Sequence, residues 1–179
     1  MSILLVDENS FGGTLMSKLK TYKDIEDLII KYGYDIISSP GMQSEKKFIQ
    51  HGNISCYHHS LSVAYMSVWL AYKMKINVDM KSLIRGALLH DYFLYDWHIP
   101  DKSHRLHGFH HAKTALENAR RDFSINDCET NIILTHMFPL NLKLPRYKES
   151  IIVNIADKIC AIFEIFRYDF VDISQVEVK

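Results

Sequence analysis

Long apolar segments with the spacing of an α-helix dominate this sequence, and residues that break helices are scarce. The 179 residues include only 7 glycines and 4 prolines. Residues 55–75, SCYHHSLSVAYMSVWLAYKMK, are mostly apolar, and residues 146–166 carry an apolar stripe. Segments of this length and spacing are typical of buried or amphipathic helices. The sequence therefore predicts an all-α fold, a single-domain helical bundle of about six or seven helices.

The remaining helices are predicted from the same periodicity and from signals at their ends. Residues 21–39 form an amphipathic pattern with Ile25, Leu28 and Ile29 on one face. Residues 80–96 are expected to form a helix for which Asp79 is a plausible N-cap. Further helices are expected over residues 44–52, 110–123, 124–137 and 146–166.

The connections and the start of the chain are less regular. Residues 97–108 and 138–145 contain prolines and are expected to be loops. Either Ser124 or Asn126 is expected to cap the helix that starts near residue 124. Residues 2–10 fit either a short strand or an irregular arm.

Composition excludes several classes of protein. The formal net charge of +0 gives no broad basic surface, so we expect no double-stranded nucleic acid as a partner. No apolar run reaches the roughly 18 residues of a membrane span, and the first residues lack the features of a signal peptide. The three cysteines are far apart and form no CxxC zinc pattern. A reducing cytoplasm is therefore the expected location.

Histidine is the one unusual component, because the chain has ten and all of them lie within residues 51–136. Together with two aspartates, several fall on the expected inner faces or ends of successive helices. One helix and one connection separate neighbouring members, so all of them can reach one point inside the bundle. The candidate ligands are His59, His90, Asp91, His111, His136 and Asp157.

These residue types suit divalent metal ions. Neutral imidazole and carboxylate bind divalent Mn, Fe, Co, Ni or Zn, and Mg is a further candidate ion. The candidate set contains no cysteine, which argues against a closed thiolate site. Four histidines and two aspartates exceed the needs of one catalytic ion but fit two ions if one carboxylate bridges them. Asp91 is the natural bridge, because its neighbour His90 is already committed to one ion.

Each member of this set also has a simpler interpretation. A single histidine on an apolar helix face is more often a core residue than a ligand. Asp157 would alternatively form a salt bridge with Arg85, Lys158 or a cation of a neighbouring helix, because an unpaired buried carboxylate is costly. His58 competes with His59, and His110 competes with His111 in the same way.

Three short stretches, HHSLSVA, GALLHD and ADKICA, resemble the HD-domain superfamily of metal-dependent phosphohydrolases. In that family a first histidine opens a helix, an HD doublet ends the next long helix, and a last aspartate lies on a late helix. These positions match His59, His90, Asp91 and Asp157. HHAKTALENA and IILTHM resemble the two further elements of the two-metal members and supply His111 and His136.

The resemblance implies three segments and a function. Residues 1–54 would be an N-terminal helical extension packed on the core, residues 55–170 the metal-binding helical domain, and residues 171–179 a tail. The implied activity is hydrolysis of a phosphomonoester or phosphodiester, with a nucleotide-like small-molecule substrate and a metal-activated water. Two divalent transition metal ions are the implied cofactors. Two alternative functions remain, a di-iron oxygenase of the same superfamily and a non-catalytic sensor that binds metal or nucleotide. Assembly into a homo-oligomer is also possible.

Further roles are assigned to side chains expected near the mouth of the site. Asp91 is expected to be catalytic through its bridging role, and His107 or His104 to protonate the leaving oxygen. Lys158 follows a ligand and is expected to face the pocket, whereas a solvated surface charge is the alternative for every basic residue here. The substrate phosphate would be bound by Lys102, His104, Arg105 and Arg146.

Overall fold

The structure, a computed structural model, describes residues 22–98 and 107–166. Seven α-helices lie in these ranges, together with one short 3-10 helix and one two-stranded hairpin, so the predicted all-α fold is confirmed. The elements are α2 (Tyr22–Ile37), α3 (Pro40–Ser44), η2 (Glu45–Lys47), β1 (Ile49–His51), β2 (Ile54–Ser55), α4 (Cys56–Lys73), α5 (Met80–Leu89), α6 (His107–Asp122), α7 (Asp127–Thr135) and α8 (Lys148–Ile165).

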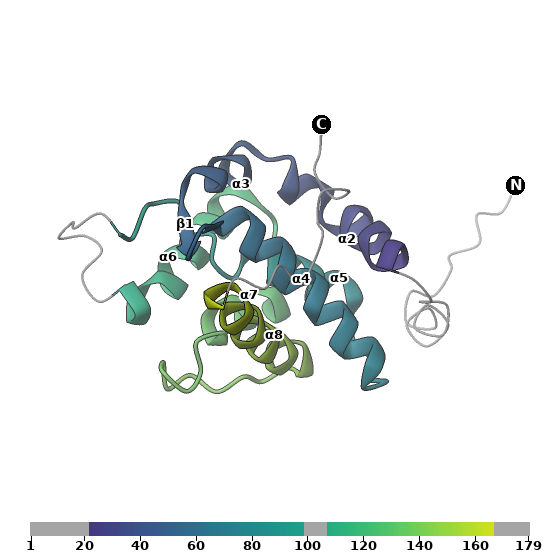
Figure 1. Cartoon of the computed structure of the whole chain (residues 1–179). Helices are drawn as coiled ribbons and strands as arrows, with labels where there is room; N and C mark the ends of the chain where they lie inside the picture. Colours follow the sequence, from purple (N-terminus) through teal and green to yellow (C-terminus); the bar gives the residue numbers. More distant parts are fainter. Residues whose placement is uncertain (1–21, 99–106, 167–179) are drawn as a thin grey trace, which may run out of the picture.

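Helices α4 and α5 form the centre of the bundle (Figure 1). Helix α4 packs on α5 and α8, whereas α5 also packs on α2 and α7. Helix α6 packs on α7 and α5, and the antiparallel hairpin β1–β2 lies against α4. Five helices therefore meet around the ends of α5 and α7, where the predicted ligands lie.

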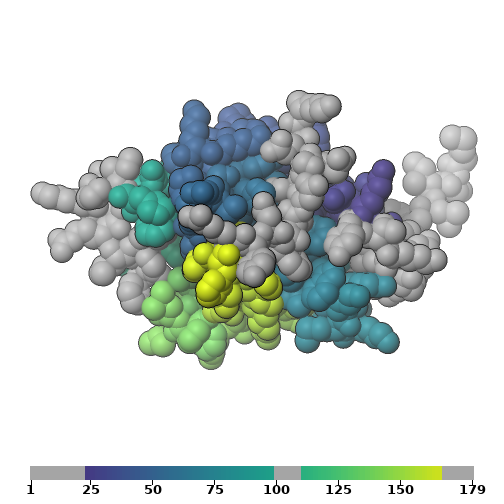
Figure 2. Space-filling view, viewed as in Figure 1, coloured from purple at the N-terminus to yellow at the C-terminus, as the bar shows by residue number. Residues whose placement is uncertain are grey.

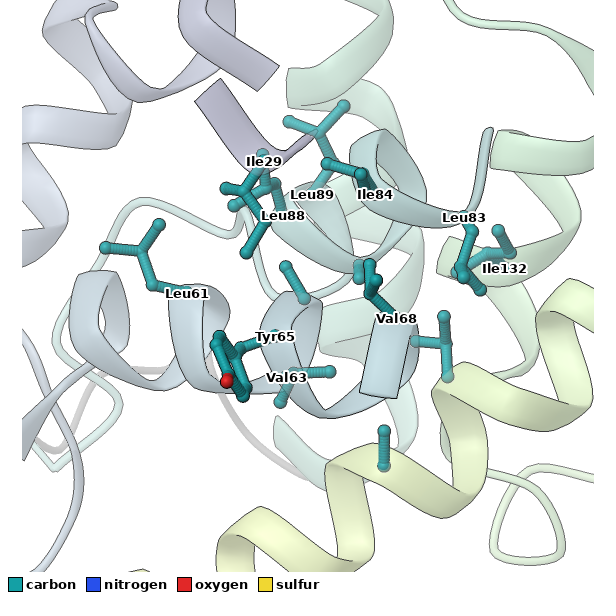
Figure 3. Close-up of a cluster of buried hydrophobic side chains, with 14 of the residues drawn as sticks. Ile29, Leu61, Val63, Tyr65, Val68, Leu83, Ile84, Leu88, Leu89 and Ile132 are labelled. Carbon is teal, nitrogen blue, oxygen red and sulfur yellow. The ribbon is translucent and has the colours of Figure 1, made fainter. Parts of the chain in front are cut away.

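The core is built from the apolar faces of these helices (Figure 3). Burial removes apolar side chains from water, and each large one contributes about 1.5–3 kcal/mol. The expected inward face of α2 is buried, and α4 is buried over most of its circumference, as its continuous apolar run predicts. Central members of the cluster are Ile29, Leu61, Val68, Leu83, Ile84, Leu88 and Ile132.

Side-chain caps fix where three of the central helices begin. The oxygen of Ser55 accepts the backbone N–H of His58, and Asp79 accepts that of Lys81, as predicted for Asp79. Asn126, and not Ser124, caps α7, and its capping box also uses the side chain of Glu129. Each cap sets the start of a helix and so the rotation at which its later residues face the core.

Two predicted helices differ from the structure. Residues 44–52 form the end of α3, the 3-10 helix η2 and strand β1 instead of one helix, because the chain turns back at Gly52 (φ +57°) to pair Ile49 with Ser55. The helix predicted over residues 80–96 ends at Leu89. The aromatic residues after it follow a different path, since Leu94 has a φ of +62°, which no α-helix contains.

Gly86 lets α5 and α7 approach closely. A β-carbon at this position would overlap Cδ1 of Ile132 and lie 3.0 Å from its Cβ. We therefore expect Gly86→Val to push α7 away and to lower the free energy of unfolding by about 1–3 kcal/mol, measured by denaturant titration. Lys81→Val on the exposed face of α5 is the control and should change stability by less than about 0.5 kcal/mol. Equal stability of both variants would contradict this role of Gly86.

The surface view shows α8 in yellow at the front of the molecule (Figure 2). Its outward positions include several exposed isoleucines, while its inward face is buried.

Within the described ranges no helix combines the length and the apolar character that a membrane crossing requires. Helix α2 packs on α4 and α5. The expected division of the chain into segments 1–54, 55–170 and 171–179 stays a prediction.

Candidate metal centre

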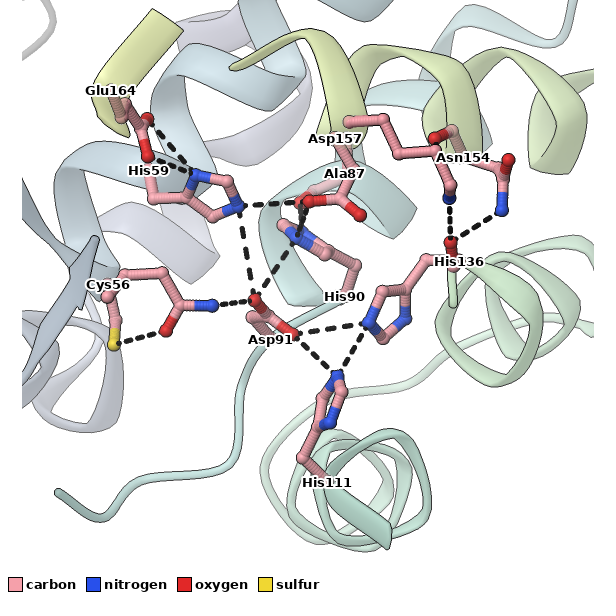
Figure 4. A network of polar contacts seen from close by, with 12 residues as sticks. Cys56, His59, Ala87, His90, Asp91, His111, His136, Asn154, Asp157 and Glu164 are labelled. Carbon is pink, nitrogen blue, oxygen red and sulfur yellow. Dashed lines mark hydrogen bonds and ion pairs between the residues drawn. The ribbon is translucent and has the colours of Figure 1, made fainter. Parts of the chain in front are cut away.

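The six side chains predicted as ligands converge on one point (Figure 4). His59 lies in the first turn of α4, His90 is the C-cap of α5 and Asp91 follows it. His111 lies on α6, His136 is the C-cap of α7, and Asp157 lies in the middle of α8. All six are buried, with exposed fractions of 0 to 8%.

The carboxylate of Asp91 lies between two groups of these ligands. Its Oδ2 is 3.4 Å from Nε2 of His90 and 3.9 Å from Nε2 of His59. Its Oδ1 is 3.3 Å from Nε2 of His111 and also 3.3 Å from Nε2 of His136. The two oxygens of one carboxylate thus face different histidine pairs, which is the arrangement expected of a bridging ligand.

The first group, called cluster A, consists of His59, His90 and Asp157. Oδ1 of Asp157 lies 3.2 Å from Nε2 of His59 and 3.7 Å from Nε2 of His90. The second group, cluster B, consists of Asp91, His111 and His136, and the two imidazole Nε2 atoms lie 2.8 Å apart. Donor atoms that share one ion at about 2.1 Å are separated by about 3.0–3.4 Å. The donor atoms of both clusters therefore lie within a few tenths of an ångström of the separations expected in a metal site.

Backbone carbonyls fix the tautomers of two of these histidines. Nδ1 of His90 lies 2.7 Å from the carbonyl oxygen of Ala87, and Nδ1 of His136 lies 2.8 Å from that of Ile133. A carbonyl only accepts hydrogen bonds, so each Nδ1 carries the proton and donates it. Each Nε2 then has a lone pair that faces the centre, as a metal ligand requires.

Two buried polar atoms of the centre have no hydrogen-bond partner among the described residues, Nε2 of His90 and Oδ1 of Asp91. Orphaned buried acceptors are rare, because each costs about 1–3 kcal/mol. A divalent cation would satisfy both atoms, and the donor set of imidazoles and carboxylates suits such an ion. The residues present therefore fit the metal that the sequence predicts.

The close contacts shift the pKa values of the acidic ligands. Burial alone would raise the pKa of Asp91, but the close imidazoles of His90, His111 and His136 hold it well below its usual range. The pKa of Asp157 is likewise lowered, because the close imidazoles of His59 and His90 outweigh its burial. Both groups are therefore ionised at neutral pH and available to bind a cation.

The pKa of His59 moves in the opposite direction. Burial by itself would lower it, but hydrogen bonds to Asp157 and Glu164 outweigh burial and raise it to about 10. In the metal-free protein both ring nitrogens of His59 therefore carry a proton at neutral pH, and the ring is positively charged. By contrast, burial and the neighbouring imidazoles lower the pKa of His136.

A pH dependence of metal binding follows from the raised pKa of His59. A cation bound through Nε2 displaces one proton at any pH below about 10, so the affinity of cluster A should rise about tenfold per pH unit between pH 6 and 8. Calorimetry in two buffers of different ionisation enthalpy measures the released proton. His98→Ala is the control, because His98 is an exposed residue paired with Asp96, and it should leave the release unchanged. An affinity that is constant over this range would contradict the prediction.

Comparison with protein families adds an independent observation. The sequence-family model described as HD domain matches residues 56–162, which is more than half of the chain. The chain belongs to the HD domain family. No curated protein and no solved structure matches it. The match confirms the predicted membership of the HD-domain superfamily, and the clustered histidines and aspartates of this HD domain are compatible with a metal site of the HD type.

The structure distinguishes between neighbouring candidates in this HD domain. His59 is fully buried in the centre, whereas His58 is only partly buried; His111 is buried, whereas His110 is exposed. Arg85, an alternative partner of Asp157, forms ion pairs with Asp35 and Glu129 instead. The assignment of the six residues as ligands stays a prediction, now with a defined geometry.

No described contact places the residues predicted to bind substrate at the metal centre. Lys102, His104 and Arg105 lie outside the described residues, and His107 begins α6 with its side chain outside them. Exposed Arg146 precedes α8 by two residues, and its backbone N–H donates to Oδ1 of Asn131. These roles remain predictions.

Lys158 lies next to Asp157, but its ammonium contacts the end of α7. Its Nζ donates to the carbonyl oxygens of His136, at 3.1 Å, and Asn154, at 3.2 Å. The amide of Asn154 also donates to the carbonyl of His136. Two side chains of α8 therefore satisfy free carbonyls at the C-terminus of α7 and hold His136 in place. A catalytic role of Lys158 stays a prediction.

Three residues that border the centre were missed by the sequence analysis. The amide of Gln50, on β1, donates to Oδ2 of Asp91, and its oxygen accepts from the thiol of Cys56. His51 follows on the same strand, and Glu164 on α8 contacts His59. Polar residues on a short strand and at a helix end carry no periodic signal, so only the folded structure brings them to the site.

Proposed function

We propose that this HD domain is a metal-dependent phosphohydrolase that cleaves a phosphomonoester or phosphodiester of a nucleotide-like small molecule. The observation that carries the proposal is the position of Asp91, whose two oxygens face cluster A and cluster B separately. Two-ion sites with such a bridge are suited to displacement at phosphorus. The match to the HD domain family supports the same reaction class.

The protein residues would perform distinct tasks. Cluster A and cluster B would each hold one divalent cation, with Asp91 shared, and such ions supply activation of water and neutralisation of phosphoryl charge when bound. His90 and His136 are held in the ligating tautomer by their own helices. Phe93, which is buried and packs edge-on against His111, limits the motion of that ring. Proton donation to the leaving oxygen by His104 or His107 completes the proposed reaction.

The proposed substrate class rests on the aromatic residues after the doublet. Tyr95 packs against Phe93, with ring centroids 4.9 Å apart, and Trp97 stacks on His98. The pKa of Tyr95 is raised to about 12 by burial and by the nearby charge of Asp91, so its hydroxyl stays protonated. Flat apolar rings in the segment directly after Asp91 favour a substrate that carries a base or another ring.

The test is a substrate panel of p-nitrophenyl phosphate, bis-p-nitrophenyl phosphate and nucleoside mono-, di- and cyclic phosphates. We expect phosphate ester hydrolysis with Mn²⁺, Co²⁺, Ni²⁺ or Fe²⁺, loss of activity with a chelator, and recovery when metal is restored. Asp91→Ala purified in the same way controls for a contaminating phosphatase. Oxygen consumption by the iron-loaded protein would favour the oxygenase, and bound metal without turnover of any substrate would favour the sensor.

A further inference from the structure

A third group of ionisable side chains adjoins the centre and includes His51, His59 and Glu164. Nδ1 of His59 lies 2.9 and 3.1 Å from the two carboxylate oxygens of Glu164, whereas its Nε2 faces Asp157 in cluster A. The ring of His51 meets that of His59 edge-on, with centroids 5.4 Å apart. Both His51 and Glu164 lie outside residues 56–162, the part that matches the HD domain model.

This group has two chemical interpretations, a third cation site or an outer support for His59. A neutral imidazole has one lone pair and one N–H. If the Nε2 lone pair of His59 binds a cation in cluster A, Nδ1 carries the proton and donates it to Glu164. The same ring then has no second lone pair for another ion, so the third group is a support and not a separate metal site.

His59 needs such a support because of its place in its helix. His90 and His136 are C-caps and donate from Nδ1 to the carbonyl three residues earlier, which is free at a helix end. His59 lies in the first turn of α4, where the carbonyls already accept N–H groups of the following turn. The acceptor for its Nδ1 must therefore come from another element, and Glu164 on α8 lies in that place (Figure 4).

The carboxylate of Glu164 is itself shielded from water. It is 8% exposed, in the last turn of α8, and strand β1 packs against that helix. Gly52, in the turn between β1 and β2, lies against the backbone carbonyl of Glu164; a β-carbon there would be 3.6 Å away. The hairpin thus covers the contact between Glu164 and His59.

We propose that Glu164 is a positioning residue that holds His59 in the tautomer whose Nε2 lone pair faces the metal centre. The inference rests on the proposed metal centre and adds a residue to it. Hydrogen-bond partners of this kind orient metal-binding histidines and typically change metal affinity by 10- to 100-fold.

The test compares Glu164→Leu, which keeps the bulk but removes the acceptor, with Glu164→Gln, which keeps an acceptor oxygen. We expect the Zn²⁺ affinity of cluster A to fall about 10- to 100-fold in Glu164→Leu and to recover in part in Glu164→Gln. Long-range ¹⁵N–¹H spectra of the Zn²⁺-loaded protein should show Nε2 of His59 bound to zinc and a protonated Nδ1, whose signal changes in Glu164→Leu.

Glu149→Leu is the matched control for burial on the same helix. Glu149 is 4% exposed and accepts the backbone N–H of Asp79, remote from the metal centre. Its replacement should lower stability but leave the Zn²⁺ affinity unchanged. Wild-type affinity and an unaltered His59 signal in Glu164→Leu would overturn the inference. A protein that binds metal through His59 but hydrolyses no substrate would instead overturn the proposed function and leave the role of Glu164 standing.

Discussion

Asp91→Ala is expected to lose both bound cations and all metal-dependent activity. Each oxygen of Asp91 faces a different cluster, so its removal takes a ligand from both. A loss of at least about 100-fold in affinity is expected at each cluster, since even residues outside the first ligand sphere reach that size. Metal content after gel filtration and turnover in the same sample measure the two effects.

The control for this variant lies five residues further along the chain. Asp96 interacts with His98 and is more exposed than Asp91, so Asp96→Ala should keep both cations. Removal of one partner of a buried charge network costs about 3–5 kcal/mol, and Asp91→Asn preserves the volume if the alanine variant does not fold. Full metal occupancy in either Asp91 variant would contradict the bridging role.

His111→Ala is expected to reduce the bound metal from two ions to one. His111 contributes only to cluster B, while the ligands of cluster A remain intact. Activity should fall by at least about 100-fold, because a single ion no longer clamps both sides of the displacement. Metal analysis of the purified variant gives the stoichiometry, and titration with Mn²⁺ shows whether one site or both are affected.

The neighbouring histidine provides a close control for His111. His110 lies on the same helix but is exposed. His110→Ala should therefore bind two ions and retain activity. Equal metal content in both variants, or loss of an ion from His110→Ala, would show that cluster B does not bind metal through His111.

Much of the fold followed from the sequence because long helices carry a strong periodic signal. The apolar run of α4 and the Asp79 cap of α5 were both read from local pattern, and the structure places them as expected. The six candidate ligands could also be named, because each lies on an inner helix face or at a helix end. Their assignment to metal stays a prediction, although the structure brings their donor atoms together.

The parts that sequence reasoning missed depend on tertiary contacts. Residues 44–52 have a helical composition, yet pairing of β1 with β2 over α4 determines their conformation. The pattern of residues 80–96 continues past the doublet, but the chain leaves the helix so that Asp91 can face both clusters. Glu164 looks like any polar residue of a helix end, and only its distance to His59 reveals its place.

The two clusters rest on different parts of the fold. His59, His90 and Asp157 belong to α4, α5 and α8, which pack on each other through the core. His111 belongs to α6, which packs on α7 and more lightly on α5, at the edge of the bundle (Figure 1). A small outward displacement of α6 would open cluster B without disturbing the other cluster. During slow chelation an ion in cluster B should therefore dissociate first, and the protein should pass through a single-ion state whose exchange kinetics are set by one peripheral helix.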